Sequence, residues 1–573
     1  MMMKNLKNAI VVVLLLSCHV MISYSQASNK VGVPKGRIEN FRFTESAIFP
    51  GTQRDISVYI PAQLDPSKPA CVYVQQDGFD PGSKFDSIFN LLISTKEMPV
   101  IVGVFIRPGS LSPQDNNNLV RPNRCFEYDA VDDSYVRFVL NEVLPTVAEK
   151  YKLKLSDKGN DRCISGCSSG GISAFNAAWQ RPDAFSRVYC ISGSFVAFRG
   201  GNEFPTLIRK TEAKPIRAFL STGTKDMENC AGDWNLLDME MDKALKFSGY
   251  EYQFFIKEGY HCGSWNNLFA DGMRYLWKDW PEPVKKGTCA PRIQDIILPG
   301  ESWEPVAEGY PFAHGPACNS KGEVYFTDCS KQKIYCIGLD GKVKEFISDA
   351  GICNSLSVGS KDEIYTVSSE SGKIMKYDTS GKGVVYAEGF HGQYILARPD
   401  GGLYVSEDAS AHEPGKIWLL KGTEEYLVDS GIPSPRGMGI SPDQWLLAVA
   451  DGHSHWVYSF EMTTDGKLIN REKFFYLQVE DWTDDSGAES VCYDREGHLY
   501  VATRMGVQVC AWDGPTQVIL PLPGNRRVTG LCFGGANADY LFAFCGDQIY
   551  KRKIKNHGIG AFSSWIKMTK GQL

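Results

Sequence analysis

The sequence predicts a multidomain protein in which an α/β domain is followed by an all-β six-bladed propeller. Three observations support this fold class. The chain has 573 residues, which is long for one domain. Strand-like and helical segments alternate in its first half. In its second half a turn-and-strand unit recurs about every forty residues. We place the boundary between the two domains at a linker over residues 281–295.

The N-terminus has the composition of a signal peptide over residues 1–27. Lys4 and Lys7 supply positive charge, a short apolar run follows, and small residues precede a cleavage point near Ala27. The apolar run is too short to span a bilayer. The four residues that end at Cys18 also resemble a lipoprotein box, which would put a lipid anchor on that cysteine. Both interpretations predict export to the periplasm, the cell surface or the medium. We expect no transmembrane helix in the rest of the chain.

Composition and charge limit the partners. The chain has 61 Lys and Arg against 67 Asp and Glu, a net charge of −6, and no basic tract, which argues against nucleic acid as a partner. Seventeen cysteines suit an oxidising compartment, and sixteen (17 − 1) are left once Cys18 is removed with the signal peptide. None of them forms a CxxC pair, which argues against a zinc ribbon.

The first domain is expected over residues 35–280. Apolar strand-like runs alternate there with longer helical segments, which predicts a largely parallel sheet. The strands are expected at residues 71–75, 100–106, 216–221 and 251–256, and helices at residues 133–151 and 233–248.

A nucleophile elbow is predicted around Ser168. Residues 166–170 read G-x-S-x-G, with Ser168 at the centre. An apolar run precedes the motif and a helical stretch, residues 171–180, follows it, which is the strand–turn–helix context that the elbow requires. The glycines let two backbone segments approach closely, and the serine hydroxyl is then exposed on a sharp turn. We therefore predict Ser168 as the nucleophile.

The base and acid that such a serine needs can also be identified. His261 is the single histidine of the first domain and follows a predicted strand, so it is the candidate base. Asp226 follows another strand and is the candidate acid that orients the imidazole. Asp233 and Asp238 are competitors, but both fall within the next predicted helix. The chain order Ser, Asp, His is that of α/β-hydrolases, which we expect for residues 35–280.

The region from about 50 to 278 resembles the esterase family that includes enterochelin esterases and bacterial feruloyl esterases. The resemblance is carried by the segments GCSSGG, STGTKD and EGYH and by NRCFEYD at residues 123–129. It implies hydrolysis of acyl esters through an acyl-enzyme, with no cofactor. Within the last segment, Glu127 and Tyr128 are either pocket residues or solvated surface positions.

The same resemblance implies an oxyanion hole. One donor would be the backbone N–H of Ser169, and the other would be the N–H of Gly78 or Phe79, after the strand that ends near residue 75. Two such donors stabilise the negative charge that develops on the tetrahedral intermediate.

Cysteines flank two of the candidate catalytic residues. Cys167 precedes the serine and Cys262 follows the histidine. This pattern resembles the CS-D-HC arrangement of tannases and fungal feruloyl esterases, in which the two cysteines are bonded to each other. The resemblance implies a Cys167–Cys262 disulfide. Two buried free thiols are the alternative.

The second domain is expected over residues 296–573. An apolar–aromatic–apolar strand follows a turn six times, which predicts six blades of four strands each. A generic β-sandwich is the alternative. The equivalent positions of the six units are Tyr325, Tyr365, Tyr404, Ala448, Tyr500 and Phe542.

This half resembles the gluconolactonase/regucalcin (senescence marker protein) family over roughly residues 300 to 560. The resemblance is carried by residues 441–451, 493–509 and 533–550. The family's enzymes hold one divalent metal at the central channel and hydrolyse sugar lactones. Here the corresponding positions differ from the family pattern: they are His314, Gln393, Tyr394, Arg436 and Glu489.

Arg436 is the decisive departure. A guanidinium has no lone pair to offer a metal and stays charged at any working pH, so it repels a divalent ion. We therefore predict that the propeller has lost its metal site and acts as a scaffold or a carbohydrate-binding module.

Export, the predicted triad and a second domain together favour an ester hydrolase that acts on carbohydrate decorated with acetyl or feruloyl-type groups. Two alternatives stay open. One is a metal-dependent sugar lactonase of the gluconolactonase type. The other is a non-catalytic protein that binds glycans or siderophores.

Overall fold

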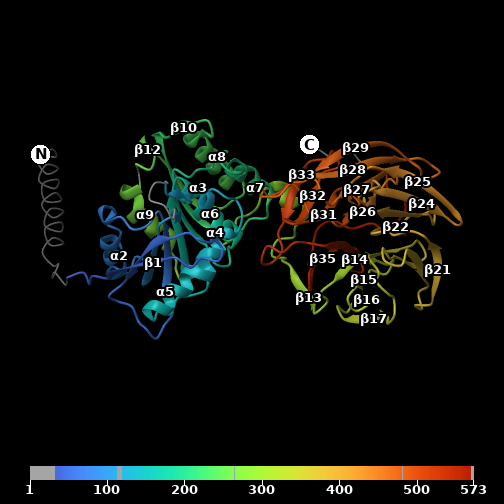
Figure 1. The fold of residues 1–573 in the computed structure, drawn as a ribbon, viewed down its shortest axis with the longest axis horizontal. Coiled ribbons are helices and arrows are strands. Elements are labelled where there is room, and N and C mark those ends of the chain that lie inside the picture. Colours follow the sequence, from blue (N-terminus) through green and yellow to red (C-terminus); the bar gives the residue numbers. More distant parts are fainter. Residues whose placement is uncertain (1–31, 113–118, 264, 481, 569–573) are drawn as a thin grey trace, which may run out of the picture.

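The computed structural model describes residues 32–112, 119–263, 265–480 and 482–568. Within these residues the chain forms two domains that lie side by side along the long axis of the molecule (Figure 1). The predicted signal peptide, including Cys18, lies outside the described residues. In the described ranges, no helix has both the length and the apolar character needed to cross a membrane.

An eight-stranded mixed sheet forms the centre of the N-terminal domain. The strand order is β1-β2-β4-β3-β7-β8-β9-β12. β2 is antiparallel to both β1 and β4, and the strands from β4 to β12 run parallel. This confirms the predicted α/β fold. The strands are β1 (Arg37–Phe43), β2 (Arg54–Ile60), β3 (Cys71–Gln76), β4 (Ile101–Ile106), β7 (Arg162–Cys167), β8 (Arg187–Ile191), β9 (Arg217–Lys225) and β12 (Glu251–Tyr260).

Helices cover both faces of this sheet, so its strands are apolar on both sides. In β3, Tyr73 packs on one face with α2 (Phe85–Ser94) and α9 (Trp265–Trp277). Val72 and Val74 face the other side, because successive side chains of a strand alternate. That side is covered by α3 (Arg124–Tyr128), α4 (Ser134–Phe138), α5 (Leu144–Tyr151), α6 (Ser169–Gln180), α7 (Phe204–Lys210) and α8 (Trp234–Phe247).

The helix predicted over residues 133–151 is interrupted by one π-helical segment. This segment, η2 (Val139–Val143), joins α4 to α5. Pro145 stands in the first turn of α5, where it has no N–H to donate and its ring crowds the carbonyl four residues earlier. The wider π turn relieves this conflict while the chain stays helical.

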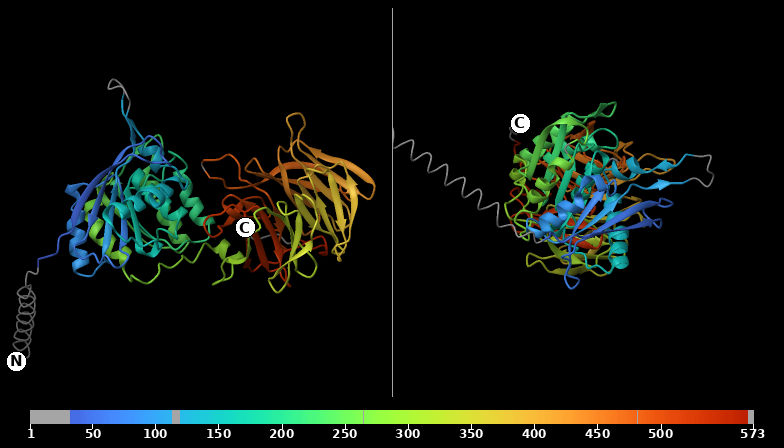
Figure 2. Two further views of the ribbon diagram at one scale, coloured as in Figure 1. Left: turned by 60° about the horizontal axis from the view of Figure 1, so that its bottom comes forward. Right: turned by 90° about the vertical axis from the view of Figure 1, so that its left-hand side faces the viewer.

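The C-terminal domain is a propeller of six four-stranded sheets (Figures 1 and 2). Its innermost strands contact one another in succession and close into a ring. They are β14 (Ala313–Cys318), β18 (Ser355–Val358), β22 (Tyr394–Ala397), β26 (Pro435–Ile440), β30 (Val491–Tyr493) and β34 (Gly530–Gly534).

Each predicted turn-and-strand unit forms the second strand of a blade. These strands are β15 (Val324–Asp328), β19 (Ile364–Val367), β23 (Leu403–Glu407), β27 (Leu446–Asp451), β31 (Leu499–Thr503) and β35 (Tyr540–Cys545). The outer strands are β16 (Lys333–Ile337), β17 (Val343–Ile347), β20 (Lys373–Tyr377), β21 (Gly383–Glu388), β24 (Lys416–Lys421), β25 (Glu424–Ser430), β28 (Trp456–Met462), β29 (Leu468–Tyr476), β32 (Gly506–Cys510), β33 (Thr516–Leu520) and β36 (Gln548–Lys553).

The ring is closed by the two ends of the domain. β13 (Glu304–Glu308), from its start, pairs antiparallel with β36, from its end, so that the last blade contains both. Pairing of this kind joins the first and last parts of the domain by backbone hydrogen bonds. The six-bladed propeller predicted from the repeats is therefore confirmed.

The segment between the domains packs against both of them. The Val284 N–H donates to Asn160 Oδ1 at 3.1 Å in the first domain. A short helix, α10 (Pro291–Ile296), then leads into the propeller. The domains also meet where α7 approaches β33, and there the buried Arg552 guanidinium pairs with Glu212 at 2.6 Å. The junction is therefore packed, with a buried ion pair across it.

Candidate active site

Ser168 sits on the sharp turn between β7 and α6. Its backbone angles, φ 60° and ψ −129°, are strained for a residue with a side chain. Backbone hydrogen bonds hold this conformation: Ser168 donates to the Ile191 carbonyl, and Ser194 donates to the Ser168 carbonyl, each at 3.1 Å. A Cβ on Gly166 would overlap the backbone of Gly170, so the two glycines of the motif permit the turn.

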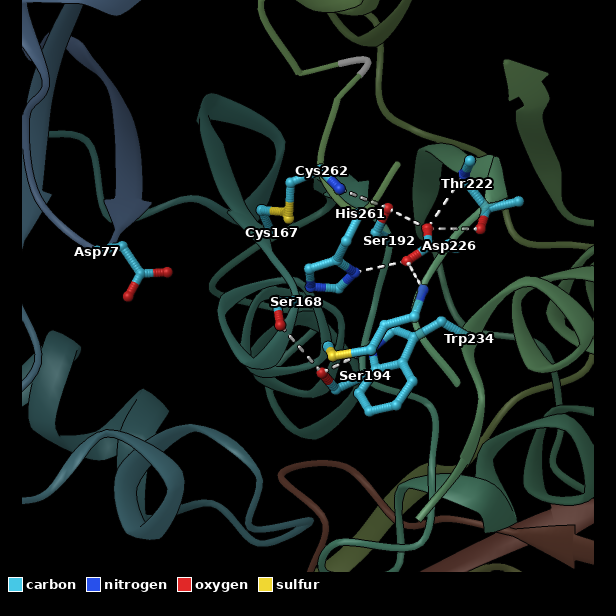
Figure 3. The surroundings of a disulfide bond; sticks show 12 residues. Asp77, Cys167, Ser168, Ser192, Ser194, Thr222, Asp226, Trp234, His261 and Cys262 are labelled. Carbon is cyan, nitrogen blue, oxygen red and sulfur yellow. Dashed lines mark hydrogen bonds and ion pairs between the residues drawn. A yellow bond between two sulfur atoms is a disulfide. The ribbon is translucent and has the colours of Figure 1, made fainter. Parts of the chain in front are cut away.

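His261 and Asp226 emerge together at one edge of the sheet. β9 and β12 are parallel neighbours, with Lys225 opposite Tyr260, and the two candidate residues directly follow these strand ends. His261 Nδ1 lies 2.5 Å from Asp226 Oδ1. Figure 3 shows the imidazole between the carboxylate and Ser168. The parallel register therefore brings the acid to the base.

Hydrogen bonds surround the Asp226 carboxylate. Its Oδ2 accepts from Ser192 Oγ at 2.6 Å, and from Thr222 Oγ1 and the Gly223 N–H at 3.0 Å each. Burial alone would raise the pKa of Asp226, but hydrogen bonds from His261, Ser192 and the backbone hold the pKa well below its usual range. The group is thus an anion that can stabilise a positive imidazolium.

The Ser168 hydroxyl has a second serine beside it. Its Oγ lies 3.4 Å from Ser194 Oγ, which accepts a hydrogen bond from Trp234 Nε1 at 3.1 Å. The edge of the His261 ring packs against the wholly buried Trp234, with 5.8 Å between ring centroids. Among the described residues, no hydrogen bond joins His261 to Ser168. Such contacts often tighten only when substrate binds.

A disulfide joins Cys167 to Cys262, with 6.1 Å between their Cα atoms (Figure 3). It ties the nucleophile elbow to the loop that carries His261. The Cys262 N–H also donates to Ser192 Oγ at 3.1 Å, so the same serine contacts both the acid and the histidine loop. Sequence analysis missed Ser192, although its position just after a parallel strand next to the elbow could have indicated it.

The predicted oxyanion donors surround the turn. Ser169 is the first residue of α6, so its N–H has no acceptor within the helix. Gly78 has φ +82° and follows β3 together with Phe79. The Asp77 N–H is already used, because it donates to Tyr128 Oη at 3.3 Å. Gly78 and Phe79 therefore stay the candidates for the second donor.

An ion pair that sequence analysis missed links three parts of the site. Arg124 Nε and Nη2 bind the two carboxylate oxygens of Asp77 at 2.7 and 2.9 Å. Arg124 Nη2 also reaches the Cys167 carbonyl at 3.4 Å. Asp77 has φ 64°, so the pair holds a strained turn just before the candidate oxyanion donors.

Glu127 and Tyr128 are neither pocket residues nor surface residues. Glu127 is buried and forms a two-pronged ion pair with Arg54, at 2.6 and 2.9 Å. Tyr128 is also buried, and its hydroxyl donates to the Ile106 carbonyl at 3.3 Å. A polar sequence suggested exposure, but each polar group has a buried partner.

The competing acids do not contact His261. Asp233 caps the N-terminus of α8 by accepting from the Leu236 N–H at 3.1 Å. Asp238 lies inside the same helix, and burial raises its pKa well above the usual range. Among the described residues, Asp226 is the carboxylate that holds the imidazole.

Four of the five positions that the family resemblance assigns to the metal and substrate site lie close together: His314, Tyr394, Arg436 and Glu489. Tyr394 Oη donates to Glu489 Oε2 at 3.0 Å, and Arg527 Nη2 binds Glu489 Oε1 at 2.6 Å. Arg436 pairs with Asp408 at 3.0 Å and has its Nε 3.9 Å from Glu489. Arg527, which sequence analysis missed, is thus a second cation at this position.

His314 lies beside Tyr394, whereas the Gln393 side chain has its hydrogen bond elsewhere. The ring of His314 lies 6.4 Å from that of Tyr394, and burial lowers the His314 pKa. Gln393 Oε1 accepts from Asn354 Nδ2 at 3.1 Å.

These residues do not fit the divalent metal that the family resemblance implies. Both oxygens of Glu489 are engaged by Tyr394 and Arg527, and a second guanidinium, that of Arg436, stands close by. Within the described ranges, no group of three or more His, Cys, Asp or Glu side chains could hold a metal ion. Two fixed positive charges oppose a third cation by Coulomb repulsion.

Together the fold and the site define a mixed α/β domain, with a serine, a histidine and an aspartate at the ends of its strands, joined to a six-bladed propeller. Residues 46–215 match the family model described as "Putative esterase", and residues 315–544 match the "SMP-30/Gluconolactonase/LRE-like region". The chain therefore carries an N-terminal domain of the first family and a C-terminal gluconolactonase/regucalcin-like propeller. The esterase match includes Ser168 and ends before Asp226 and His261.

Individual relatives each cover about half of the chain. A gluconolactonase of Zymomonas mobilis subsp. mobilis is 20% identical over 314 residues, which is 47% of this chain and 86% of that protein. The structure of a Xanthomonas campestris gluconolactonase is 18% identical, covers 46% of this chain and 93% of its own, and has a TM-score of 0.40. A ferulic acid esterase structure is 17% identical, covers 42% and 98%, and has a TM-score of 0.34.

Proposed function

We propose that this chain is an exported serine carboxylic ester hydrolase that removes acetyl or feruloyl-type groups from carbohydrate. One observation carries the proposal: Ser168, on a strained turn, stands beside His261, whose Nδ1 is bound to the buried carboxylate of Asp226. The esterase family match supports ester hydrolysis. The predicted signal peptide and the second domain support an extracytoplasmic glycan as the alcohol component.

In the first half-reaction, Ser168 Oγ attacks the carbonyl carbon of the ester while His261 Nε2 takes the hydroxyl proton. Asp226 holds Nδ1 as the protonated nitrogen, so Nε2 is the basic one. The negative charge that forms on the carbonyl oxygen is stabilised by the N–H of Ser169 and a second backbone donor. Each donor of this type contributes about 3 kcal/mol to the transition state.

The tetrahedral intermediate then collapses. The bond between the carbonyl carbon and the alcohol oxygen breaks, and the imidazolium gives its proton to the departing sugar hydroxyl. The acyl group is left on Ser168. His261 next takes a proton from water as the water oxygen attacks the acyl carbon. The bond between that carbon and Ser168 Oγ then breaks, the imidazolium returns the proton to Ser168 Oγ, and the carboxylic acid is released.

The surroundings of His261 support an aromatic acyl group as one substrate type. The Phe198 ring is 43% exposed and packs edge-on against Trp234, with 5.6 Å between centroids. Trp234 in turn contacts His261. An aromatic acyl ring placed here gains offset or edge-on contacts, which contribute about 0.5–1.5 kcal/mol per ring pair beyond the buried area.

A metal-dependent lactonase is the second candidate, because the propeller matches a gluconolactonase over much of its length. The guanidinium groups of Arg436 and Arg527 argue against this candidate, because they lie beside Glu489, at the position where a lactonase of this type would bind its divalent metal ion. Chelation separates the two candidates, because the serine mechanism requires no metal.

The test is hydrolysis of p-nitrophenyl acetate, acetylated xylan, methyl ferulate and a sugar lactone by the mature protein, with and without EDTA. We expect turnover that EDTA leaves unchanged and that Ser168→Ala abolishes, with a loss of roughly 10⁶-fold in kcat. The exposed Ser380→Ala is the matched control and keeps full activity. Lactone turnover that EDTA abolishes, with Ser168→Ala fully active, would overturn the proposal in favour of the lactonase.

A further inference from the structure

A cleft runs between the two domains, away from Ser168. It consists of an inner cavity of about 240 Å³ and an outer groove of about 460 Å³. The two parts share residues from both domains and are therefore continuous: Gln180, Glu480, Arg504 and Asn525. Helix α6 has Ser168 at one end and Gln180 at the other, and its 12 residues span about 18 Å. The cleft is thus separate from the candidate active site.

The inner cavity contains polar groups with unused hydrogen-bonding capacity. Lys214 is only 8% exposed and donates to the Trp179 carbonyl at 2.6 Å. Lys214 Nζ also lies 4.3 Å from the centroid of the Trp179 ring. An ammonium group has three donors, so at least one is left for another partner. On the propeller side, the Glu480 carboxylate has neither a hydrogen bond nor an ion pair to another described residue. Lys214 is buried and Glu480 is partly buried, and polar groups removed from water are costly unless something binds them.

Trp482 forms an aromatic platform in the outer groove. Its side chain is 51% exposed, and the Arg504 guanidinium lies 5.8 Å from its ring centroid. Arg504 is itself fixed by Asp485, through hydrogen bonds of 2.8 and 3.1 Å. The ion pair therefore fixes the guanidinium beside the indole of Trp482, much of which stays accessible.

The arginines of the groove are already paired with carboxylates. Arg137 binds Asp133 at 2.8 Å, and Arg527 binds Glu489 at 2.6 Å. A phosphate- or sulfate-bearing ligand would have to compete with these partners. An apolar ligand would leave the remaining Lys214 donor and the Glu480 carboxylate without a hydrogen-bonding partner. The cleft therefore favours an uncharged molecule that both donates and accepts hydrogen bonds.

Sugar rings can satisfy the polar groups of the inner cavity and also pack on the Trp482 platform. Their hydroxyl groups donate and accept, and the C–H face of a pyranose packs on an indole. We propose that the cleft binds a neutral oligosaccharide, with one ring between Lys214 and Glu480 and another stacked on Trp482. The inner cavity is smaller than the ~300–1,000 Å³ of sites for drug-sized ligands, which suits a single ring. Domain interfaces are favoured places for ligand sites.

Binding at this cleft requires neither Ser168 nor His261, so it goes beyond the proposed esterase activity. A site in this cleft would also explain why the two domains are joined in one chain, because both contribute side chains to the same ligand. A glycan bound there is held roughly one helix length from the nucleophile.

Isothermal titration of the full-length mature Ser168→Ala protein tests the proposal. The probes are neutral hexasaccharides with xylan, glucan, mannan and arabinan backbones. We expect one backbone to bind, with Trp482→Ala and Glu480→Gln each weakening its affinity about 3–10-fold, the range of a lost ring contact. Trp512 lies outside the cleft and is 44% exposed, against 51% for Trp482, so Trp512→Ala is the control and leaves the affinity unchanged.

Three results would overturn the proposal. They are no binding by any of the neutral probes at millimolar concentration, tighter binding of sulfated than of neutral probes, and affinity that neither cleft variant changes. Esterase activity of the unmutated protein is measured in parallel. Activity without hexasaccharide binding therefore refutes the cleft site alone, and binding without activity refutes the esterase alone.

Discussion

At the residue scale, the orientation of the His261 imidazole by Asp226 can be tested by a single substitution. It holds His261 Nδ1 at 2.5 Å, which leaves Nε2 basic toward Ser168. Asn in its place keeps the shape but donates where Asp accepts, so it favours the wrong tautomer. We expect Asp226→Asn to lower kcat by roughly 10⁴-fold with KM little changed. Steady-state kinetics on p-nitrophenyl acetate measure this.

Asp233→Asn is the matched control for that substitution. Asn caps a helix about as well as Asp, so α8 and the activity are both retained. Equal kcat values for the two variants would show that Asp226 does not orient the base.

Arg124 is expected to affect catalysis indirectly, by fixing the backbone that carries the candidate oxyanion donors. It binds Asp77 in the strained turn before Gly78 and Phe79 and reaches the Cys167 carbonyl. Arg124→Met removes the clamp, and a displacement of about 1 Å at the oxyanion donors would cost roughly 10²-fold in kcat. KM for p-nitrophenyl acetate changes little. The exposed Arg42→Met serves as the control, and an unchanged kcat for Arg124→Met would exclude the positioning role.

The sequence predicted site residues where a local signal marked them. Ser168 has its glycine motif, and His261 and Asp226 directly follow strands. Ser192 and Arg124 have no such motif, because their contacts join segments far apart in the chain. Glu127 was misjudged for the same reason: its partner, Arg54, is 73 residues away.

At the scale of elements, the Cys167–Cys262 disulfide connects the elbow to the loop after β12. It closes a loop with a sequence separation of 95 residues, which restricts the unfolded chain. We expect the double variant Cys167→Ser/Cys262→Ser to lose about 2–4 kcal/mol in the unfolding free energy of the esterase domain. Urea unfolding followed by circular dichroism measures it.

The double variant Cys125→Ser/Cys230→Ser is the control, since both cysteines are free and exposed. A midpoint for the disulfide variant equal to that of the control would contradict a stabilising role.

Strands and helices were predicted correctly where a single hydrophobic pattern extends over the whole element. The six second strands of the blades share one pattern, which is why the blade number could be counted from the sequence. The helix at residues 133–151 was predicted as one element, yet η2 interrupts it. Periodicity alone did not reveal this change, although Pro145 marks its place.

At the scale of the whole molecule, Lys214 gives the domain junction a pH dependence. Burial lowers its pKa to about 7, against about 10.4 in an unfolded chain. Between these values the unfolded chain binds the extra proton, so stability rises with pH through this window. Relative to Lys214→Met, the wild type gains up to about 1.4 kcal/mol per pH unit from pH 7 to 10.

Thermal melting of both proteins from pH 6 to 10 checks this expectation. The difference between their midpoints should be constant below pH 7 and should change in favour of the wild type above it. Parallel curves across the whole range would contradict a buried Lys214 with a lowered pKa. The neighbouring Glu480, whose pKa burial raises, is present in both proteins.

The contact between the domains lay beyond sequence analysis. A Pro- and Lys-containing segment indicated a boundary, and its composition suggested a linker. The contacts there are made by surfaces that fit only after both domains have folded, as in the pair of Arg552 with Glu212. The cleft, which needs both domains, was therefore unpredictable.

Covalent labelling of the nucleophile tests the central claim most directly. The mature protein is treated with a fluorophosphonate, and the adduct is located by peptide mass spectrometry. We predict one adduct, on Ser168, that is absent from Ser168→Ala and formed far more slowly in His261→Ala. No adduct on Ser168, or equal labelling of the His261→Ala protein, would contradict a serine activated by this histidine.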